Sequence, residues 1–497
     1  MRTDLGGCVA VSNQGHARWK ADGVALLLFF FISLAANAPL LAPYELYLDD
    51  YPQFDQGIVR WFASRGLWRI AGTVLPGWLV ANGLYGLMAI CLHAVGGYLF
   101  YRVVREGLQS LSLALFASVV MVAFPWGYQA LIWASAFSYA LASCALWAIV
   151  LVLLRFRCDG MPAYFLAGVL AVASFTCLLF HEAAFFPLCF AGVIVWARRS
   201  RALAHWKSDL AVSLAPLLGA LSWGLAYEAF KPEHPLKEVA NVHLPAILSA
   251  IFNQVRAVEV FDVWTNASLR DYAISATGAR YAICAVIAIC AVPFLVRMLL
   301  RTEDRVEEPT SSSKSFDITP GMFLICALVL LAGAAGIYVL AGGYSFDARK
   351  RYLIIPFFIL TAAAVACVVR GPQSRTFVSR GGALVASALC VVGCATSFLV
   401  MSVWSGEMQR LNRLADLIAD RGVAGDVSVV WNPDVYRIWP RAERSWGIEA
   451  AVGLREALRA RDSEAISLTP ESPQRIVWDV RRQQWRLSMG EAAWMDP

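Results

Sequence analysis

The feature that most constrains this chain is a series of uninterrupted apolar runs, each about 20 residues long. A helix of this length crosses the ~30 Å hydrocarbon core of a bilayer and satisfies its own backbone hydrogen bonds there. The composition agrees, because 59% of the 497 residues are hydrophobic and 16% are charged, whereas soluble domains carry about 25% charged residues. The sequence therefore predicts an all-α polytopic membrane protein whose surroundings are a lipid bilayer.

About eleven apolar runs have the length of membrane spans. They cover approximately residues 24–43, 77–101, 108–125, 131–154, 161–180, 183–197, 209–228, 279–300, 320–342, 352–369 and 383–404. We expect the first run to be retained, because it is long for a signal peptide and Pro39 would directly follow the cleavage position. The runs 161–180 and 183–197 could also form one bent element, which would invert the topology downstream.

The basic residues predict an orientation. The net charge is +6, and Lys and Arg lie mainly in short connections between the apolar runs. With a cytoplasmic N-terminus, each inside connection carries at least two basic residues, as the positive-inside rule requires. The basic connections after residue 197 argue against the inverted alternative. We therefore interpret the charge as a topology signal of an inner (plasma) membrane protein and expect no nucleic-acid partner.

This orientation divides the chain into a transmembrane domain, residues 1–404, and an extracytoplasmic tail, residues 405–497. Two longer exterior loops cover residues 44–76 and 229–278. The tail alternates helical and strand patterns, with helices near 408–420 and 448–459 and strands at 427–431, 475–478 and 485–487. We predict a small periplasmic α/β domain there.

Two classes of cofactor have no motif in the sequence. The 12 cysteines include no CxxC pair and no Cys/His ligand spacing, so we infer neither a zinc site nor a disulfide framework. Glycine-rich phosphate loops of the Walker or Rossmann type are absent as well. We therefore expect no nucleotide cofactor.

An acidic pair, Asp49 and Asp50, directly follows the first predicted span. Adjacent carboxylates repel each other unless a proton or a cation neutralises one of them. Such a pair can supply a general base for an acceptor hydroxyl, or it can hold a divalent cation. Alternatively, the pair only ends the helix at the interface, while the neighbouring tyrosines form an aromatic belt.

The same loop contains an amphipathic pattern over residues 55–72, which predicts a helix lying flat on the outer surface. Its polar face includes Arg60, Arg65 and Arg69, which oppose the positive-inside bias. One reason would be an anionic ligand such as a lipid phosphate, to which Arg65 would bind. Attraction to ordinary anionic headgroups explains the pattern equally well.

This arrangement of spans, acidic first loop, flat exterior helix and exterior tail resembles the GT-C glycosyltransferase superfamily. Its members include protein O-mannosyltransferases, oligosaccharyltransferase catalytic subunits and aminoarabinose transferases. The chain is also similar to bacterial GtrII-like glucosyltransferases of surface polysaccharide. The resemblance implies a polyprenyl-phosphate-linked sugar as donor, and it implies a catalytic-base role for Asp49 or Asp50.

A second candidate is the run Arg349-Lys350-Arg351-Tyr352 at the outer end of the tenth predicted span. Arginine can grip two phosphate oxygens at once, so Arg349 or Arg351 could hold the donor phosphate as it leaves. Related membrane transferases often show a basic-aromatic pair here, which Arg351 and Tyr352 resemble. The alternative is that these cations snorkel and anchor the helix.

Two further candidates lie at short exterior turns. His181 and Glu182 are ionisable groups near membrane depth, where such groups are costly, so they are candidates for binding a sugar or orienting an acceptor. The alternative is that water simply hydrates this turn. Gln129, between Trp126 and Trp133, could hydrogen-bond a sugar that stacks on the indoles, although tryptophans of an interfacial belt are commoner.

Together these residues predict a membrane glycosyltransferase that moves a sugar from a polyprenyl-phosphate donor to a glycan or lipid acceptor. Direct displacement would invert the anomeric centre, and a divalent cation could sit at Asp49 and Asp50. The alternatives are a flippase or transporter of lipid-linked sugars, or an O-antigen-type polymerase. The predicted spans 24–43, 131–154 and 320–342 contain no Asp, Glu, Lys, Arg or His, which favours chemistry at the outer face over transit.

Overall fold

The computed structural model describes most of the helical part of the chain and four strands of the tail. The described residues are 5–43, 70–155, 163–198, 206–229, 261–306, 318–340, 348–370, 380–420, 425–430, 458, 466–468, 474–479 and 484–489. The acidic pair, Arg65 and nearly all of the amphipathic segment 55–72 lie outside these residues.

The first half of the described chain forms the helices from α1 to α12. The elements are α1 (Leu5–Asn37), the 3-10 helix η1 (Ala38–Leu41), α4 (Ile70–Ala81), α5 (Tyr85–Leu108), α6 (Leu111–Ala123), α7 (Gln129–Ile132), the 3-10 helix η2 (Ala134–Ala136), α8 (Phe137–Arg155), α9 (Ala163–Phe180), the 3-10 helix η3 (Glu182–Ala184), α10 (Phe185–Ala191), α11 (Val193–Arg198) and α12 (Trp206–Ala229).

The second half adds two short helices, four long ones and a sheet. The elements are α14 (Asp262–Thr265), α15 (Ala267–Ala276), α16 (Ala279–Val306), α17 (Pro320–Leu340), α18 (Ala348–Arg370), α19 (Arg380–Asp420), β1 (Gly425–Val430), β2 (Ile466–Leu468), β3 (Gln474–Asp479) and β4 (Gln484–Met489).

Among the described residues, 8 helices are long and apolar enough to cross a membrane. Three shorter apolar stretches accompany them, at Leu111–Ala123, Glu182–Ala197 and Pro320–Gly336. The prediction of a helical, polytopic membrane protein is confirmed. The count of eleven spans stays a prediction.

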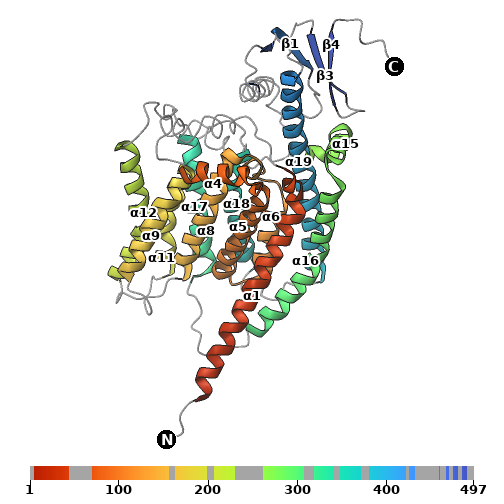
Figure 1. Cartoon of the computed structure of the whole chain (residues 1–497). Helices are drawn as coiled ribbons and strands as arrows, with labels where there is room; N and C mark the ends of the chain where they lie inside the picture. The colour runs from red at the N-terminus through yellow and green to blue at the C-terminus, as the bar shows by residue number, and fades with distance from the viewer. Residues whose placement is uncertain are drawn as a thin grey trace.

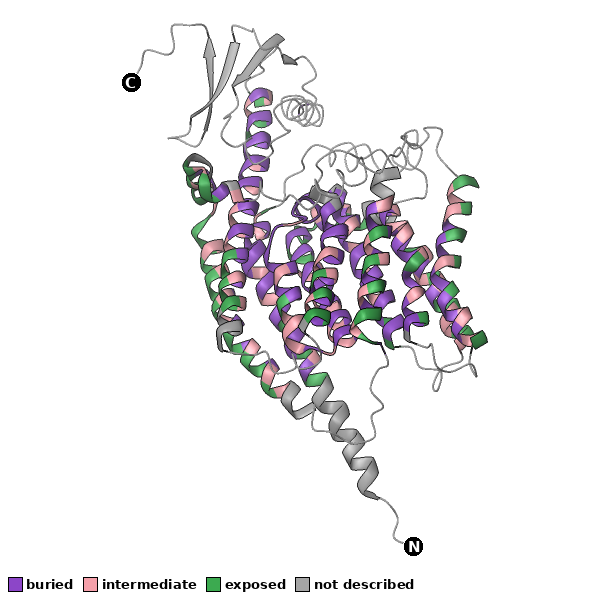
Figure 2. Cartoon of the chain, turned by 180° about the vertical axis from the view of Figure 1, so that it is seen from behind, coloured by how far each residue is buried: buried purple, intermediate pink, exposed green. Residues whose placement is uncertain are grey.

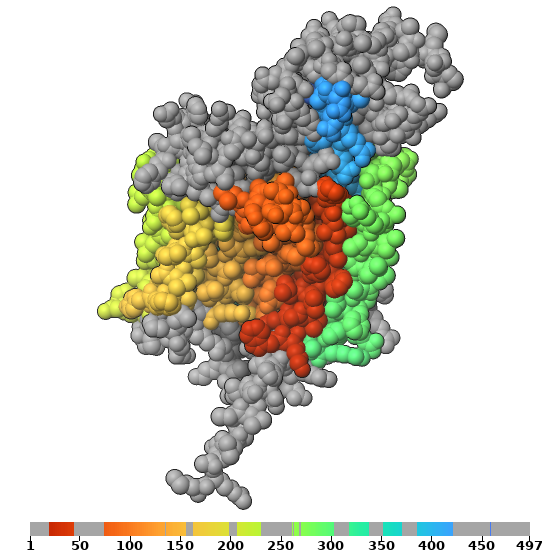
Figure 3. Space-filling view, viewed as in Figure 1, coloured from red at the N-terminus to blue at the C-terminus, as the bar shows by residue number. Residues whose placement is uncertain are grey.

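The helices pack as a bundle in which α8 is central and α9 and α16 are peripheral. In their most apolar windows, 78% of α8 is buried but only 22% of α9 and of α16. Figure 2 shows buried residues facing the inside of the bundle and exposed residues along its outer helices. In Figure 3, α16 lies along α1 at one edge of the molecule, in agreement with the contacts between these two helices. The exposed apolar faces are those that lipid would cover.

Ion pairs bring the ends of three spans together at one end of the bundle. Arg102 of α5 pairs with Asp22 of α1, and it also bonds Glu106 at 2.7 Å. Glu106 in turn accepts from Arg155 of α8 at 2.9 Å. This is the end where the sequence predicts the basic cytoplasmic connections. The start of α1 extends beyond it, and the sheet lies beyond the opposite end (Figure 1).

Two predicted span boundaries differ in the structure. The predicted span 77–101 is divided, because α4 ends in a turn in which Leu84 N–H donates to Leu79 and Gly83 N–H donates to Val80. Gly83 has a φ of +66°, so this is a glycine-terminated helix end of the Schellman type. In the predicted span 131–154, the extended backbone of Trp133 (φ −89°, ψ 121°) separates α7 from η2, so the long helix begins only at Phe137.

The predicted ranges 161–180 and 183–197 are separate in the structure. His181 has an extended conformation (φ −160°, ψ 130°), which ends α9 before η3 and α10 begin.

The tail begins as a continuation of a span, since α19 runs unbroken across the predicted boundary at 404/405. Beyond it, the strand order is β2-β1-β3-β4, with β1 parallel to β2 and β3, and with β3 antiparallel to β4. Strands β1, β3 and β4 overlap the segments predicted as strands. A separate α/β domain over 405–497 stays a prediction, because most residues between the strands lie outside the described part.

Candidate functional site

The described candidates gather at the end of the bundle nearest the sheet. Tyr352 in the first turn of α18 packs against Gly127, and His181 packs on Tyr139 in the first turn of α8. The other end of α8 carries Arg155 and its ion pairs. The structure thus brings three of the predicted exterior segments to one end.

Arg351 is a buried cation at the start of α18. Its relative exposure is 1%, so the side chain does not snorkel toward water. A charge buried beside a membrane span is costly and is therefore a candidate for binding an anion. Arg349 lies two residues earlier in the same helix, but its side chain is outside the described part of the structure.

A small cavity of about 20 Å³ adjoins Arg351. It has room for about one water molecule. Its polar or aromatic lining comes from α1, α5, the turn before α7 and α18, through Asn37, His93, Trp126, Tyr128, Arg351 and Tyr352. The structure therefore joins the predicted residues Arg351, Tyr352 and Trp126 in one place.

Close packing fixes Tyr352. A Cβ atom on Gly127 would lie 2.5 Å from the Cβ and 2.6 Å from the Cα of Tyr352, so only glycine fits there. The Tyr352 hydroxyl lies 2.8 Å from Nδ1 of His93. The hydroxyl predicted to bind substrate is thus engaged by a histidine that the sequence analysis did not identify. His93 could have been identified from the sequence, because it is a lone ionisable residue inside an apolar run.

The aromatic turn between α6 and α8 is packed internally. Trp126 donates from Nε1 to the Val120 carbonyl at 2.9 Å and stacks on Phe124 with ring centroids 5.2 Å apart. Trp133 is 6% exposed, so it does not belong to a lipid-facing belt. Gln129 begins α7, is buried and does not line the cavity at Arg351. Its role in binding a sugar stays a prediction.

His181 serves as a cap in this structure. Its Nδ1 accepts the Ala183 N–H at 3.1 Å and so carries no proton, while its ring lies 3.7 Å from that of Tyr139. The 3.7 Å approach of Nδ1 to a Glu182 carboxylate oxygen is therefore not a charge pair. His181 is buried, Glu182 is half-buried, and neither lines the cavity at Arg351. A role for Glu182 in orienting an acceptor stays a prediction.

A buried ion pair on the extension of α19 was not foreseen from the sequence. Glu407 accepts from Arg410 at 3.0 Å, and both side chains are buried. Tyr272 of α15 hydrogen-bonds this pair, and burial, followed by the Glu407 carboxylate, raises the pKa of the Tyr272 hydroxyl well above its ordinary value of 10.0. The cluster holds α15 against α19, so we assign it a structural role.

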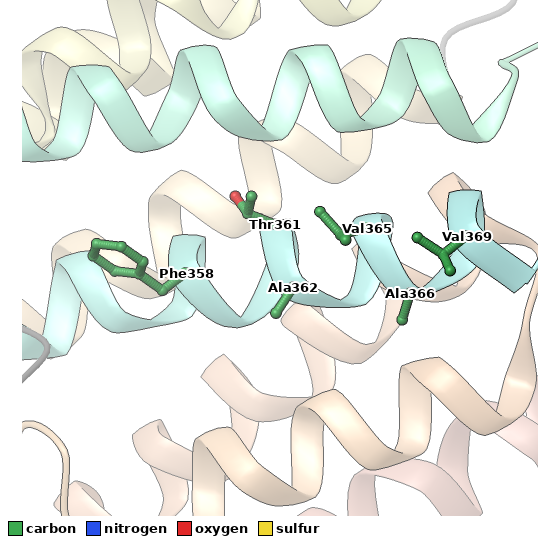
Figure 4. Close-up of a pocket in the computed structure, with 6 residues that line it drawn as sticks. All are labelled: Phe358, Thr361, Ala362, Val365, Ala366 and Val369. Carbon is green, nitrogen blue, oxygen red and sulfur yellow. The ribbon is translucent and has the colours of Figure 1, made fainter.

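Neither a larger hollow nor a metal cluster offers a better site. A shallow apolar hollow follows the surface of α18 and is lined by Phe358, Thr361, Ala362, Val365, Ala366 and Val369 (Figure 4). Its lining has no charged group, and Ala362, Val365 and Val369 are exposed on the surface of the bundle. Within the described ranges, no three His, Cys, Asp or Glu residues lie close enough to hold a metal ion. The predicted cation position at Asp49 and Asp50 lies outside those ranges.

The fold and the cavity define a polytopic helical membrane protein with a buried cation at one end of its bundle. No protein-family model and no curated protein matches the chain.

Proposed function

We propose that the protein is a membrane glycosyltransferase that moves a sugar from a polyprenyl-phosphate donor to a glycan or lipid acceptor. The observation that carries the proposal is the burial of Arg351 at the end of a span, in the wall of a small cavity that Asn37 and His93 also line. Such a cation can hold the phosphate of a lipid-linked donor that approaches from the bilayer. Because the cavity has room for about one water molecule, the donor phosphate must widen it to reach Arg351.

The chemistry needs a base and a stabilised leaving group. Asp49 or Asp50 takes the proton of the acceptor hydroxyl, and the oxygen forms a bond to the anomeric carbon. The bond from that carbon to the phosphate oxygen breaks with its electron pair, and Arg351 stabilises the departing phosphate. The anomeric centre is inverted. A divalent cation at the acid pair would assist by neutralising charge.

The first loop follows Pro43, and Asn37, a few residues earlier, lines the cavity at Arg351. This position of Asn37 supports the proposal that the loop brings Asp49 and Asp50 to the cavity. We place this end of the bundle at the outer face of a bacterial inner membrane, because the opposite end carries Arg102 and Arg155, as a cytoplasmic end would.

The alternatives are a flippase or transporter, and an O-antigen-type polymerase. A transporter needs polar groups along a path through the bilayer. The cavity at Arg351 lies at one end of the bundle, which supports surface chemistry over transit. A polymerase would act on lipid-linked sugars at the same face, and the size of the transferred unit separates it from a monosaccharide transferase.

Single substitutions test the proposal in cells. Asp49→Asn, Asp50→Asn and Arg351→Ala should be compared with Arg413→Ala, which removes an exposed arginine on α19. We expect loss of the glycan modification for Arg351→Ala and for at least one aspartate variant, at unchanged protein level, and no loss for Arg413→Ala. Normal glycan from all of the first three variants would refute the proposed function.

A further inference from the structure

His93 is a buried ionisable side chain in the membrane-spanning helix α5, and the proposed chemistry does not use it. Its relative exposure is 5%, and it lines the same cavity as Arg351. An imidazole at such depth is stable only when its ring nitrogens have partners. Both nitrogens do have partners, one on α6 and one on α18.

The two bonds fix the protonation state of the ring. Nε2 lies 3.1 Å from the carbonyl oxygen of Val122, which can only accept, so Nε2 carries the hydrogen. In the neutral ring, Nδ1 then has a lone pair and accepts the Tyr352 hydroxyl proton at 2.8 Å. A second proton on Nδ1 would place a charge inside the apolar bundle, where His93 is 5% exposed, and burial disfavours this charge. We therefore assign a neutral histidine with its hydrogen on Nε2, which accepts from Tyr352 through Nδ1.

These bonds join three elements at the wall of the cavity. His93 belongs to α5, Val122 to the last turn of α6, and Tyr352 to the first turn of α18. Gly127 packs closely against the Cα and Cβ of Tyr352. Since Arg351 directly precedes Tyr352, whatever fixes Tyr352 also fixes the backbone that carries the cation.

We propose that His93 is a positioning residue that acts through Tyr352. Its neutral ring sets the first turn of α18, and so it holds Arg351 where the cation meets the phosphate of a lipid monophosphate. The identity of this ligand rests on the proposed function, whereas the effect of His93 on Arg351 does not.

Three variants separate this role from a general loss of packing. His93→Gln offers an amide that can donate to Val122 and accept from Tyr352. His93→Leu removes both bonds. Tyr352→Phe removes only the hydroxyl, leaves the helix contact with Gly127 and is the mildest change, so it keeps the test valid if His93→Leu fails to fold.

The experiment uses the full-length protein in lipid nanodiscs with farnesyl phosphate as the probe. We expect His93→Leu and Tyr352→Phe to weaken binding of farnesyl phosphate about 10-fold, the scale of one lost buried hydrogen bond, and His93→Gln to retain it within about 3-fold. In the same samples, NMR of histidine and arginine side-chain nitrogens should show His93 protonated on Nε2. The Arg351 signal, assigned by its loss in Arg351→Lys, should be shifted in Tyr352→Phe.

The outcomes separate the two claims. If the wild type binds farnesyl phosphate and Tyr352→Phe and His93→Leu bind it equally well, the positioning role is overturned while the proposed function stands. If no form of the protein binds the probe, the proposed function loses its support. The positioning role is then decided by the Arg351 signal, because a shift in Tyr352→Phe supports it and an unchanged signal overturns it.

Discussion

Replacement of Gly127 by alanine tests the contact that sets the first turn of α18. The new Cβ would lie 2.5 Å from the Cβ and 2.6 Å from the Cα of Tyr352. Carbon atoms prefer separations of about 3.5–4.0 Å, so the turn or the helix must move by about 1 Å. The atoms in the way belong to the helix backbone or lie next to it, and no side-chain rotation can relieve the overlap.

The cost follows from this displacement. Overpacking of this kind typically destabilises a protein by about 1–3 kcal/mol. The same movement would carry Arg351 away from its position in the cavity, and a misplacement of about 1 Å in an active site can reduce activity about 100-fold. We therefore expect Gly127→Ala to lose product formation even under conditions in which most of the protein remains folded.

The matched control is Gly168→Ala on the peripheral helix α9, where an added Cβ would have no atom within 4 Å. There alanine should be neutral or stabilising by up to about 1 kcal/mol, because it favours the helix. Thermal unfolding of both purified variants, together with glycan analysis of cells that express them, measures the difference. Equal stability and equal product for the two variants would refute the packing described for Tyr352.

Three further predictions concern packing away from the cavity. Glu407→Ala leaves Arg410 buried without this carboxylate, so the free energy of unfolding should fall by about 3–5 kcal/mol, measured by thermal unfolding. A fall in the free energy of unfolding below about 1 kcal/mol would contradict a buried ion pair. Tyr272 has a raised pKa in the folded protein, so its hydroxyl loses the proton first in the unfolded state, and the free energy of unfolding should fall as pH rises above 10.0. Tyr272→Phe should remove part of that fall. An unchanged pH profile would argue against the cluster of Tyr272, Glu407 and Arg410. Gly86→Ala would place a Cβ onto the Leu40 carbonyl oxygen and should greatly reduce the yield of folded protein, while a normal yield would contradict the contact of η1 with α5.

The membrane class and the helical ranges were predictable because they depend on local physics. An apolar run must be satisfied by its own backbone hydrogen bonds, so length and composition are sufficient to indicate a span. The turn at Gly83 was missed because both neighbouring segments are apolar, and hydropathy does not register a single residue with positive φ. The extended backbone at Trp133 was missed as well, because hydropathy does not register backbone conformation.

The site was predictable only in part. Arg351 and Tyr352 stand out as a basic-aromatic pair opposed to the topology bias. His93 does not, since its importance arises from a bond to Tyr352, 259 positions away in sequence. A contact between residues so far apart in sequence can be recognised only from the folded structure. The bond of His181 to Ala183 was likewise not foreseen, and a role of His181 in binding a sugar stays a prediction.

The central claim is that this protein adds a sugar to an acceptor at the membrane surface. Mass spectrometry of surface glycans and lipid-linked intermediates, from cells with and without the gene, tests it most directly. We predict that deletion removes one defined sugar unit from the glycan and that a polyprenyl-phosphate-linked sugar of the same mass accumulates. Identical glycans and intermediates in both strains would contradict the claim.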